Sequence, residues 1–347
     1  MKMKNCKNIL LIIILSLSIF SCKKEEELTD SIIDASTPNL TKLDEWIRAN
    51  YTYPFNIEVK YRFDGTEVDR NKVLVAPDSA AVQPFLTAMK RLWIDPYLKN
   101  SGDFFVKNYI PKQLVLIGSE NYNSDGTITL GQAESGRKII MYGVNNFSTK
   151  VNPEISMKEN QKQLKSKFHT MHHEFAHILH QNIPYSEEYQ TITKGYTSNW
   201  YHIEVDDALR QGFITPYGMS EPNEDFVEMI ATILTNTKTD FDYIISKNYI
   251  VQQQTLTQIN KALDLLYEAK AKETDATKKE RMTKDIADIK DLIIKETAKL
   301  ETYKQGYLNL RKKEKIIVDY FKQSWNTDIY ALQKEIDTQS LQLLLGK

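Results

Sequence analysis

The residues best suited to chemistry lie in one short segment, because five of the six histidines fall between residues 169 and 180. Within it, His173, Glu174 and His177 form the pattern His-Glu-x-x-His, which on a helix places both histidines on one face, one turn apart. Their imidazoles can then bind one tetrahedral Zn²⁺ ion, and Glu174 can take a proton from a water molecule that the metal polarises. The pattern predicts two zinc ligands and a general base.

A catalytic zinc site also needs a third protein ligand and an open fourth position. In the metzincin pattern a Gly and a third His follow, but His180 and Ile183 stand in those places here, which excludes that family. His180 shares the face of the two ligand histidines but lies a further turn along the helix. We therefore expect His180 to support the site from outside the ligand set, or to be structural. The competing interpretation of the whole segment is a helix whose histidines are merely polar.

The third ligand is expected downstream, where the turn-rich residues 212–222 lead into a helix-like run at 224–234. Glu224 and Glu228 lie one turn apart on one face of that helix. A carboxylate at its start can bind the metal, while an acid one turn later can hydrogen-bond a ligand histidine. Glu224 fits the first role and Glu228 the second. Rival third ligands are Glu204, Asp206 and Asp207 in the neighbouring run 203–210.

The N-terminus predicts export and lipidation. Three lysines precede an apolar run at 9–20 that is too short to span a bilayer and is typical of a signal peptide. Ser21-Cys22 follows and resembles a bacterial lipobox, so that residues 1–21 would be removed and Cys22 lipidated. The charged start of the linker 22–38 resembles the signal that sends Bacteroidetes lipoproteins to the outer face of the outer membrane. The alternative is an ordinary cleaved signal followed by a solvated linker.

Cysteine usage and net charge exclude other classes of function. Cys6 would leave with the signal and Cys22 would carry lipid, so no thiol remains for disulfides, for cysteine-protease chemistry or for zinc-thiolate latency. The formal charge of −1 becomes −4 once the three signal-peptide lysines are removed. No basic field indicates nucleic-acid binding.

The order of these residues resembles known zinc peptidases. Tyr217-Gly218 followed by residues 224–228, behind a His-Glu-x-x-His helix, is similar to the catalytic core of anthrax lethal factor and related gluzincins. The segment 212–217 and the lipoprotein start more closely resemble the zinc metallopeptidase lipoproteins of Bacteroidetes, which are substrate import-associated metallohydrolases. The motif match covers mainly residues 169–234, and the general layout most of the chain.

That resemblance implies roles for two residues. Glu224 becomes the third zinc ligand, and the Tyr217 hydroxyl donates to the oxyanion that forms on the substrate. The alternative for Tyr217 is an aromatic side chain that simply packs over the core. No departure from the family's ligand set is evident.

The remaining pattern predicts an α+β, zincin-like core at residues 39–250. Helices are expected at 40–50 and 80–98, and a mixed sheet is expected from strands at 57–63, 113–117, 127–130 and 138–144. We expect the strand at 138–144 to be the sheet edge that pairs with an extended peptide. The region 251–347 is expected to be helical, with a long hairpin at 255–312 whose charges form a solvated face and further helices at 316–321 and 328–345.

Together these observations predict a surface-tethered, zinc-dependent metallohydrolase with one zinc per chain, most simply a peptidase associated with nutrient uptake. Its partners would be a peptide or protein substrate, the outer membrane through Cys22, and an outer-membrane import complex. One alternative is a zinc-containing scaffold lipoprotein without activity. Another is hydrolysis of a non-peptide amide, which the sequence does not separate from proteolysis.

Overall fold

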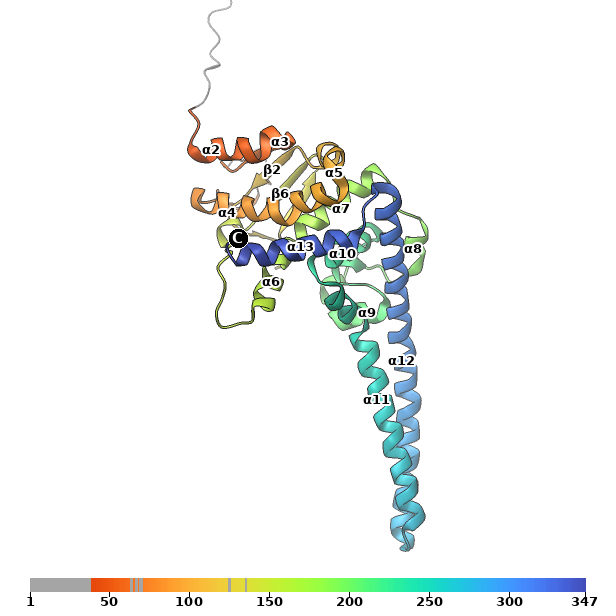
Figure 1. Cartoon of the computed structure of the whole chain (residues 1–347). Helices are drawn as coiled ribbons and strands as arrows, with labels where there is room; N and C mark the ends of the chain where they lie inside the picture. The colour runs from red at the N-terminus through yellow and green to blue at the C-terminus, as the bar shows by residue number, and fades with distance from the viewer. Residues whose placement is uncertain (1–38, 63–64, 66–67, 69–70, 124–125, 135) are drawn as a thin grey trace, which may run out of the picture. The chain divides into compact units, whose positions relative to one another are not determined.

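The computed structural model describes residues 39–347 except 63–64, 66–67, 69–70, 124–125 and 135 (Figure 1). The predicted signal peptide and linker, including Cys22, lie outside the described residues. Residues 42–347 form one unit by their internal contacts. Among the helices of the described part, none has both the length and the apolar character needed to cross a membrane.

A four-stranded mixed sheet has the order β1-β2-β6-β5. Strands β1 (Glu58–Lys60), β2 (Gln113–Leu116) and β6 (Lys138–Met141) are parallel, and β5 (Gly131–Glu134) runs antiparallel to β6. A separate hairpin joins β3 (Asn121–Tyr122) to β4 (Ile128–Thr129). The predicted α+β class with a mixed sheet is confirmed, but the strand expected at 127–130 is β4 of the separate hairpin and does not belong to the mixed sheet.

The prediction that the strand at 138–144 forms the sheet edge is wrong. β6 lies between β2 and β5. Its consecutive residues Ile139 and Ile140 are both almost fully buried, in apolar clusters on opposite faces of the sheet. A continuous apolar run is typical of a strand covered on both faces. The edge is β5 instead, whose sequence Gly-Gln-Ala-Glu has no apolar alternation to reveal it.

Helices before the histidine segment pack with one face of the sheet in the main core. The predicted first helix is α2 (Lys42–Ile47), which continues through the π-helix η2 (Arg48–Thr52) into α3 (Tyr53–Phe55). The second begins at α4 (Ser79–Met89), capped by the Asp78 side chain, and continues through η3 (Lys90–Ile94) into α5 (Asp95–Tyr109). Both helices are therefore confirmed, but each extends beyond its predicted end.

The middle of the chain supplies the helices that carry the candidate site. After η4 (Val144–Asn146) come α6 (Met157–Ser166), α7 (His169–Asn182) and α8 (Glu188–Ile192). They are followed by η5 (Trp200–His202), α9 (Val205–Gln211), η6 (Tyr217–Met219) and α10 (Pro222–Thr235). α7 and α10 each bury an apolar side in the main core, through residues such as Phe175 and Leu179 on α7 and Phe226 and Ile230 on α10.

The C-terminal region is helical as predicted. α11 (Lys238–Lys272) and α12 (Ala276–Trp325) form the long antiparallel hairpin, joined by three residues of which Asp275 caps α12 (Figure 1). The predicted separate helix at 316–321 is wrong, because these residues continue α12 without a break. α13 (Ile329–Leu344) follows a left-handed turn at Asn326. The boundary expected between residues 250 and 251 falls inside α11.

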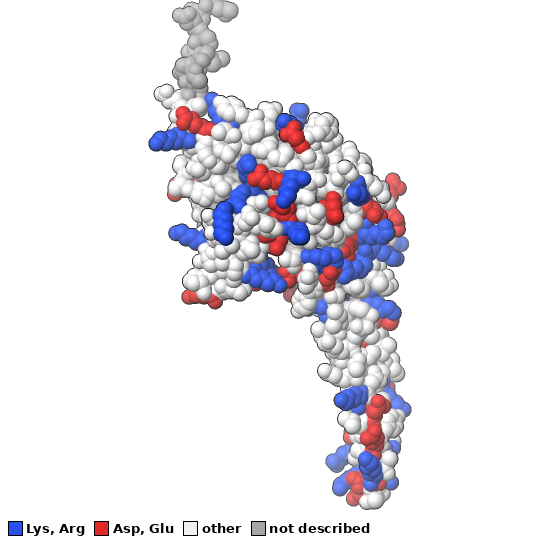
Figure 2. All heavy atoms as spheres, in the orientation of Figure 1, with Lys and Arg blue, Asp and Glu red and all other residues white. Residues whose placement is uncertain are grey.

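Charged side chains on the hairpin are of both signs. Figure 2 shows lysines, arginines and acidic residues interspersed along it rather than gathered into a field of one sign. Such a surface is typical of a solvated helix face.

Candidate metal centre

α7 presents its histidines on one face because its opposite side is fixed in the core. The Phe175 ring packs edge-on against Trp93 and Tyr97, with ring centroids 5.4 and 5.0 Å apart. His173 and His177, four residues apart, then point together from the other side of the helix. The spacing that predicted a shared face is thus reinforced by aromatic packing from η3 and α5.

The structure brings His173 and His177 of α7 together with Glu224 of α10, with one donor atom of each within 4.8 Å of the others. The His173 Nε2 and His177 Nε2 atoms are 3.2 Å apart. Glu224 Oε2 lies 3.0 Å from His173 Nε2, and Glu224 Oε1 lies 3.3 Å from His177 Nε2. Atoms bound at zinc's usual distances around a tetrahedral ion lie about 3.3 Å apart. The three separations therefore match those of zinc ligands.

The chemistry of these atoms also fits a metal cation. His173 Nδ1 donates to Glu228 Oε1 at 2.8 Å, and His177 Nδ1 can donate to His180 Nε2 at 3.1 Å, which leaves lone pairs on both Nε2 atoms. Glu224 Oε2 is buried and has no hydrogen-bond donor among the described residues when His173 Nε2 carries no proton. Lone pairs and a carboxylate that face one another at about 3 Å need a cation between them. The residues thus fit Zn²⁺.

Ionisation of the apo site follows from the same contacts. Burial raises the pKa of Glu224, but its interactions with His173 and His177 outweigh burial and lower the pKa to about 2. Burial lowers the pKa of His173, but Glu224 and Glu228 outweigh it and raise the pKa to about 10. In the absence of metal, His173 is therefore protonated, and its positive charge balances the neighbouring carboxylates as the metal cation would.

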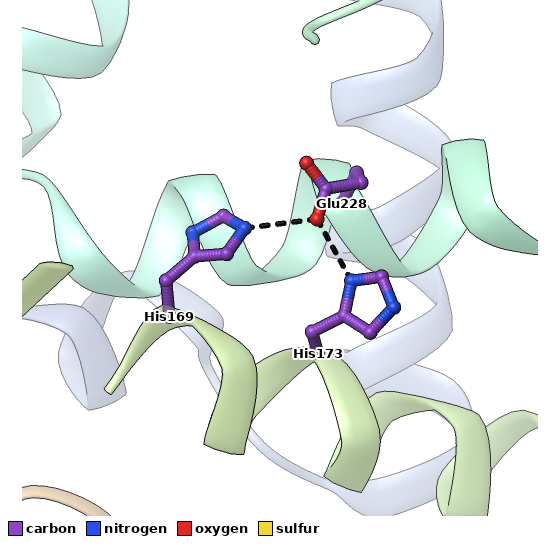
Figure 3. A group of neighbouring side chains, drawn as sticks. All are labelled: His169, His173 and Glu228. Atoms are coloured by element: carbon purple, nitrogen blue, oxygen red, sulfur yellow. Dashed lines mark hydrogen bonds and ion pairs between the residues drawn. The ribbon is translucent and has the colours of Figure 1, made fainter. Parts of the chain in front are cut away.

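Glu228 is placed to orient a ligand, as Figure 3 shows. Its Oε1 atom accepts hydrogen bonds from His169 Nε2 at 2.9 Å and from His173 Nδ1 at 2.8 Å, and Oε2 accepts one from Thr215 Oγ1 at 2.7 Å. Burial raises the pKa of Glu228, but His169 and His173 outweigh it and lower the pKa well below its usual value. An ionised Glu228 thus holds the His173 ring through Nδ1, with Nε2 directed at the ligand group.

His169, His173 and Glu228 form a second group with metal-compatible spacing. This group uses His173 through Nδ1, whereas the first group uses Nε2 of the same ring. We interpret the second group as the hydrogen-bonded support of the first. The sequence analysis did not predict that His169 would bond Glu228. Its position four residues before His173, on the same helix face, could have indicated this role.

His180 lies outside the ligand group and contacts His177. Burial, and then the neighbouring His177, lower the pKa of His180 to about 4, so its ring is neutral at ordinary pH. A neutral ring with a free Nε2 atom can accept the His177 Nδ1 proton. His180 is thus placed to hydrogen-bond His177 from outside the ligand group, and its supporting role stays a prediction.

Glu174 is held against the sheet edge. Its Oε2 atom accepts a hydrogen bond of 2.8 Å from the backbone N–H of Ala133 on β5. Burial raises the pKa of Glu174, although the nearby His173 and His177 act in the opposite direction. A buried carboxylate with a raised pKa is suited to take up and release a proton.

The outer edge of β5, the last strand of the sheet, faces the same place. Tyr142 N donates to Leu130 O, and in an antiparallel pair the hydrogen-bonded residues alternate. Gly131 and Ala133 therefore turn their backbone groups away from β6. A Cβ atom at Gly131 would lie 2.5 Å from Thr170 Cγ2, so glycine permits α7 to approach this strand.

A cavity of about 360 Å³ opens beside these groups. Its walls include His173, Glu174 and Tyr217 from the site and Gly131 from the sheet edge. His169 and Glu228 also line it. The other lining residues, which come mainly from the β3–β4 hairpin and from η5, are uncharged: Asn123, Thr127, Ile128, Thr129, Leu130, Thr170 and Trp200. The candidate base and the candidate hydroxyl donor thus face one accessible space.

Tyr217 on η6 packs between the site and an aromatic wall. Its ring centroid lies 5.8 Å from that of His173 and 4.9 Å from that of Trp200, and the side chain is 37% exposed. Burial, and then the carboxylates of Glu224 and Glu174, raise the pKa of Tyr217. Its hydroxyl therefore keeps its proton at neutral pH and can act as a hydrogen-bond donor.

The rival third ligands lie elsewhere. Asp206 pairs with Lys247 at 3.1 Å, and Asp207 pairs with Arg210 at 2.5 Å. Glu204 is an exposed residue at the start of α9. None of the three belongs to either metal-compatible group among the described residues.

Comparisons with known proteins agree with this geometry. A family model described as "Putative zinc-binding metallo-peptidase" matches residues 36–330. A solved structure described in the same words, from Bacteroides caccae, is 26% identical, with a TM-score of 0.57; the match covers 90% of this chain and 97% of that one. A search of curated proteins gives no match.

Proposed function

Because the chain belongs to this family of zinc-binding metallo-peptidases, we propose that it is a zinc-dependent peptidase whose general base is Glu174. The observation that carries the proposal is the position of Glu174. Its carboxylate lies beside the His173–His177–Glu224 group and is bonded to the edge of the sheet.

His173, His177 and Glu224 would hold the metal. When bound, zinc supplies a Lewis acid that makes water a better nucleophile and polarises the carbonyl group of the substrate. Glu174 would take the proton of the attacking water and deliver it to the leaving nitrogen. The Tyr217 hydroxyl would donate to the substrate oxygen as negative charge develops there.

An extended peptide fits the sheet edge. Gly131 and Ala133 turn their backbone groups outward, and a peptide strand placed beside β5 could pair with groups that remain open there. The scissile bond of that peptide would then lie in the cavity that Glu174 and Tyr217 line. This geometry favours a peptide over a compact amide substrate. The accessible space beside a base and a donor also favours an enzyme over a zinc-containing scaffold.

The proposal extends to location. The signal-like run and Ser21-Cys22 support a lipid anchor on Cys22, and the charged segment after it supports display on the outer face of the outer membrane, beside an import system. Labelling cells with a fatty-acid analogue tests the anchor: the parent protein should carry the label, and Cys22→Ser should not.

Cleavage of a peptide library tests the catalytic proposal. The library is a digested bacterial proteome, and new termini are identified by mass spectrometry after incubation with zinc-loaded protein. Glu174→Gln preserves the shape of the side chain but cannot act as a base, so it should lose nearly all cleavage while keeping its zinc. Glu204→Gln, a surface change of the same kind, should behave as the parent. Parental cleavage rates in Glu174→Gln would refute the mechanism.

A further inference from the structure

α12 buries a lysine against the segments that carry the site. Lys313 is fully buried, as is its partner Asp225 on α10. The Lys313 ammonium lies 2.5 Å from Asp225 Oδ2 and donates a hydrogen bond of 2.7 Å to the backbone oxygen of Gly212. It also lies 4.3 Å from the centroid of the Phe213 ring. One charged group therefore joins three separate parts of the chain.

Asp225 directly follows Glu224, so its contacts fix the turn of α10 that carries the candidate ligand. Its Oδ2 atom also accepts a hydrogen bond of 3.1 Å from the Tyr196 hydroxyl. Its backbone oxygen accepts one of 3.0 Å from the Tyr189 hydroxyl. With both its side chain and its backbone held, Asp225 leaves the adjacent residue little freedom.

Gly212 begins the loop that leads to Tyr217. It ends α9 in the left-handed conformation, with φ of 85°. Further along this loop, Thr215 Oγ1 donates to Glu228 and accepts from Gly218 N at 3.1 Å. A Cβ atom at Gly218 would lie only 3.4 Å from Asp225 Cα, so this loop packs directly against α10.

Close helix packing places Lys313 at this junction. A Cβ atom at Gly306 would lie 2.4 Å from the backbone oxygens of Leu209 and Arg210, so only glycine permits this approach of α12 to α9. Residue 313 lies seven positions, or about two turns, further along the same face of α12. The contact at Gly306 therefore sets the position of the Lys313 ammonium.

We propose that Lys313 is a positioning residue for the metal centre, which fixes the turn bearing Glu224 relative to the loop bearing Tyr217. The inference rests on the proposed roles of those two residues. Stability alone does not account for a buried ion pair, since apolar residues of similar volume often stabilise a core equally well. An apolar pair at positions 313 and 225, however, could not hydrogen-bond the Gly212 oxygen, and so could not hold the loop to α10 as the Lys313 ammonium does.

The test compares zinc affinity with thermal stability, using Zn²⁺ and a competing chelator below the unfolding temperature of each variant. Lys313→Met leaves a buried charge without its partner, so its melting temperature should fall. Lys313→Met/Asp225→Asn removes that charge and should regain most of the loss. Both variants should nevertheless bind zinc about ten- to a hundredfold more weakly than the parent, the usual cost of losing support around a metal ligand.

Lys165→Met is the matched control. Lys165 is also almost fully buried, and pairs at 2.6 Å with Asp337, which joins α6 to α13. Neither residue belongs to a metal-compatible group in the described part of the chain. It should lower the melting temperature without changing zinc affinity. Parental zinc affinity in the double variant would overturn the proposal and leave Lys313 a purely structural role.

Glu224→Ala, measured in parallel, distinguishes this failure from that of the proposed function. If Glu224→Ala loses zinc but the double variant does not, only the role of Lys313 is refuted. If Glu224→Ala binds zinc as the parent does, the ligand assignment fails, and the role of Lys313 fails with it.

Discussion

Replacing Glu228 by alanine should weaken zinc binding because it removes the acceptor behind His173. The carboxylate accepts three hydrogen bonds, of which only the 2.8 Å bond from His173 Nδ1 acts directly on a proposed ligand. A hydrogen bond to a charged group contributes about 1.5–3 kcal/mol, which corresponds to an affinity loss of roughly ten- to 150-fold. Glu228→Gln should have a smaller effect, since its neutral oxygen can still accept.

The assay is competition for Zn²⁺ against a chromophoric chelator, with folding checked by circular dichroism. Thr215→Val is the matched control, because it removes the 2.7 Å bond to the other oxygen of Glu228 and leaves the His173 bond in place. It should change zinc affinity by less than about threefold, because the charged contact to the ligand is retained. If folded Glu228→Ala bound zinc within threefold of the parent, the supporting role of Glu228 would be refuted.

Three further predictions concern the hydroxyl donor, the sheet edge and the proton on the ligand His173. Tyr217→Phe should lower kcat by about 10²–10³-fold with zinc content unchanged; an unaltered kcat would leave Tyr217 as a packing residue. Gly131→Ala should destabilise the fold by about 1–3 kcal/mol, measured by chemical denaturation, because its Cβ atom would lie 2.5 Å from Thr170 Cγ2. The double variant Gly131→Ala/Thr170→Ser lacks that methyl group and should regain the lost stability. Zinc affinity should rise at least about tenfold per pH unit from pH 6 to 8, since metal must displace the proton that Glu224 and Glu228 hold on His173, whose apo pKa is raised to about 10; pH-independent affinity in calorimetry would contradict this assignment.

The sequence predicted those parts of the site that depend on local helical spacing. His173, Glu174 and His177 share a face because of their positions on α7, and Glu224 and Glu228 because of theirs on α10. Periodicity also identified the hairpin and the inner strands of the sheet. These features depend on neighbours within a turn or two of the chain, which a single sequence displays directly.

The missing parts depend on contacts between distant segments. β5 has no apolar alternation, so pairing with β6 rather than its own pattern makes it a strand. The bonds from His169 and Thr215 to Glu228 require α7, α10 and the η6 loop to meet. Lys313 stands within the charged run 311–315, where nothing local distinguishes this fully buried lysine from the exposed Lys312 and Lys315.

The central claim is that His173, His177 and Glu224 hold one zinc ion. It is tested most directly by metal analysis of protein lacking residues 1–22, with Glu224→Ala purified and zinc-loaded in the same way. The account predicts one zinc per chain in the parent and its loss or marked weakening in Glu224→Ala. Undiminished zinc in Glu224→Ala, or no zinc in the loaded parent, would contradict it.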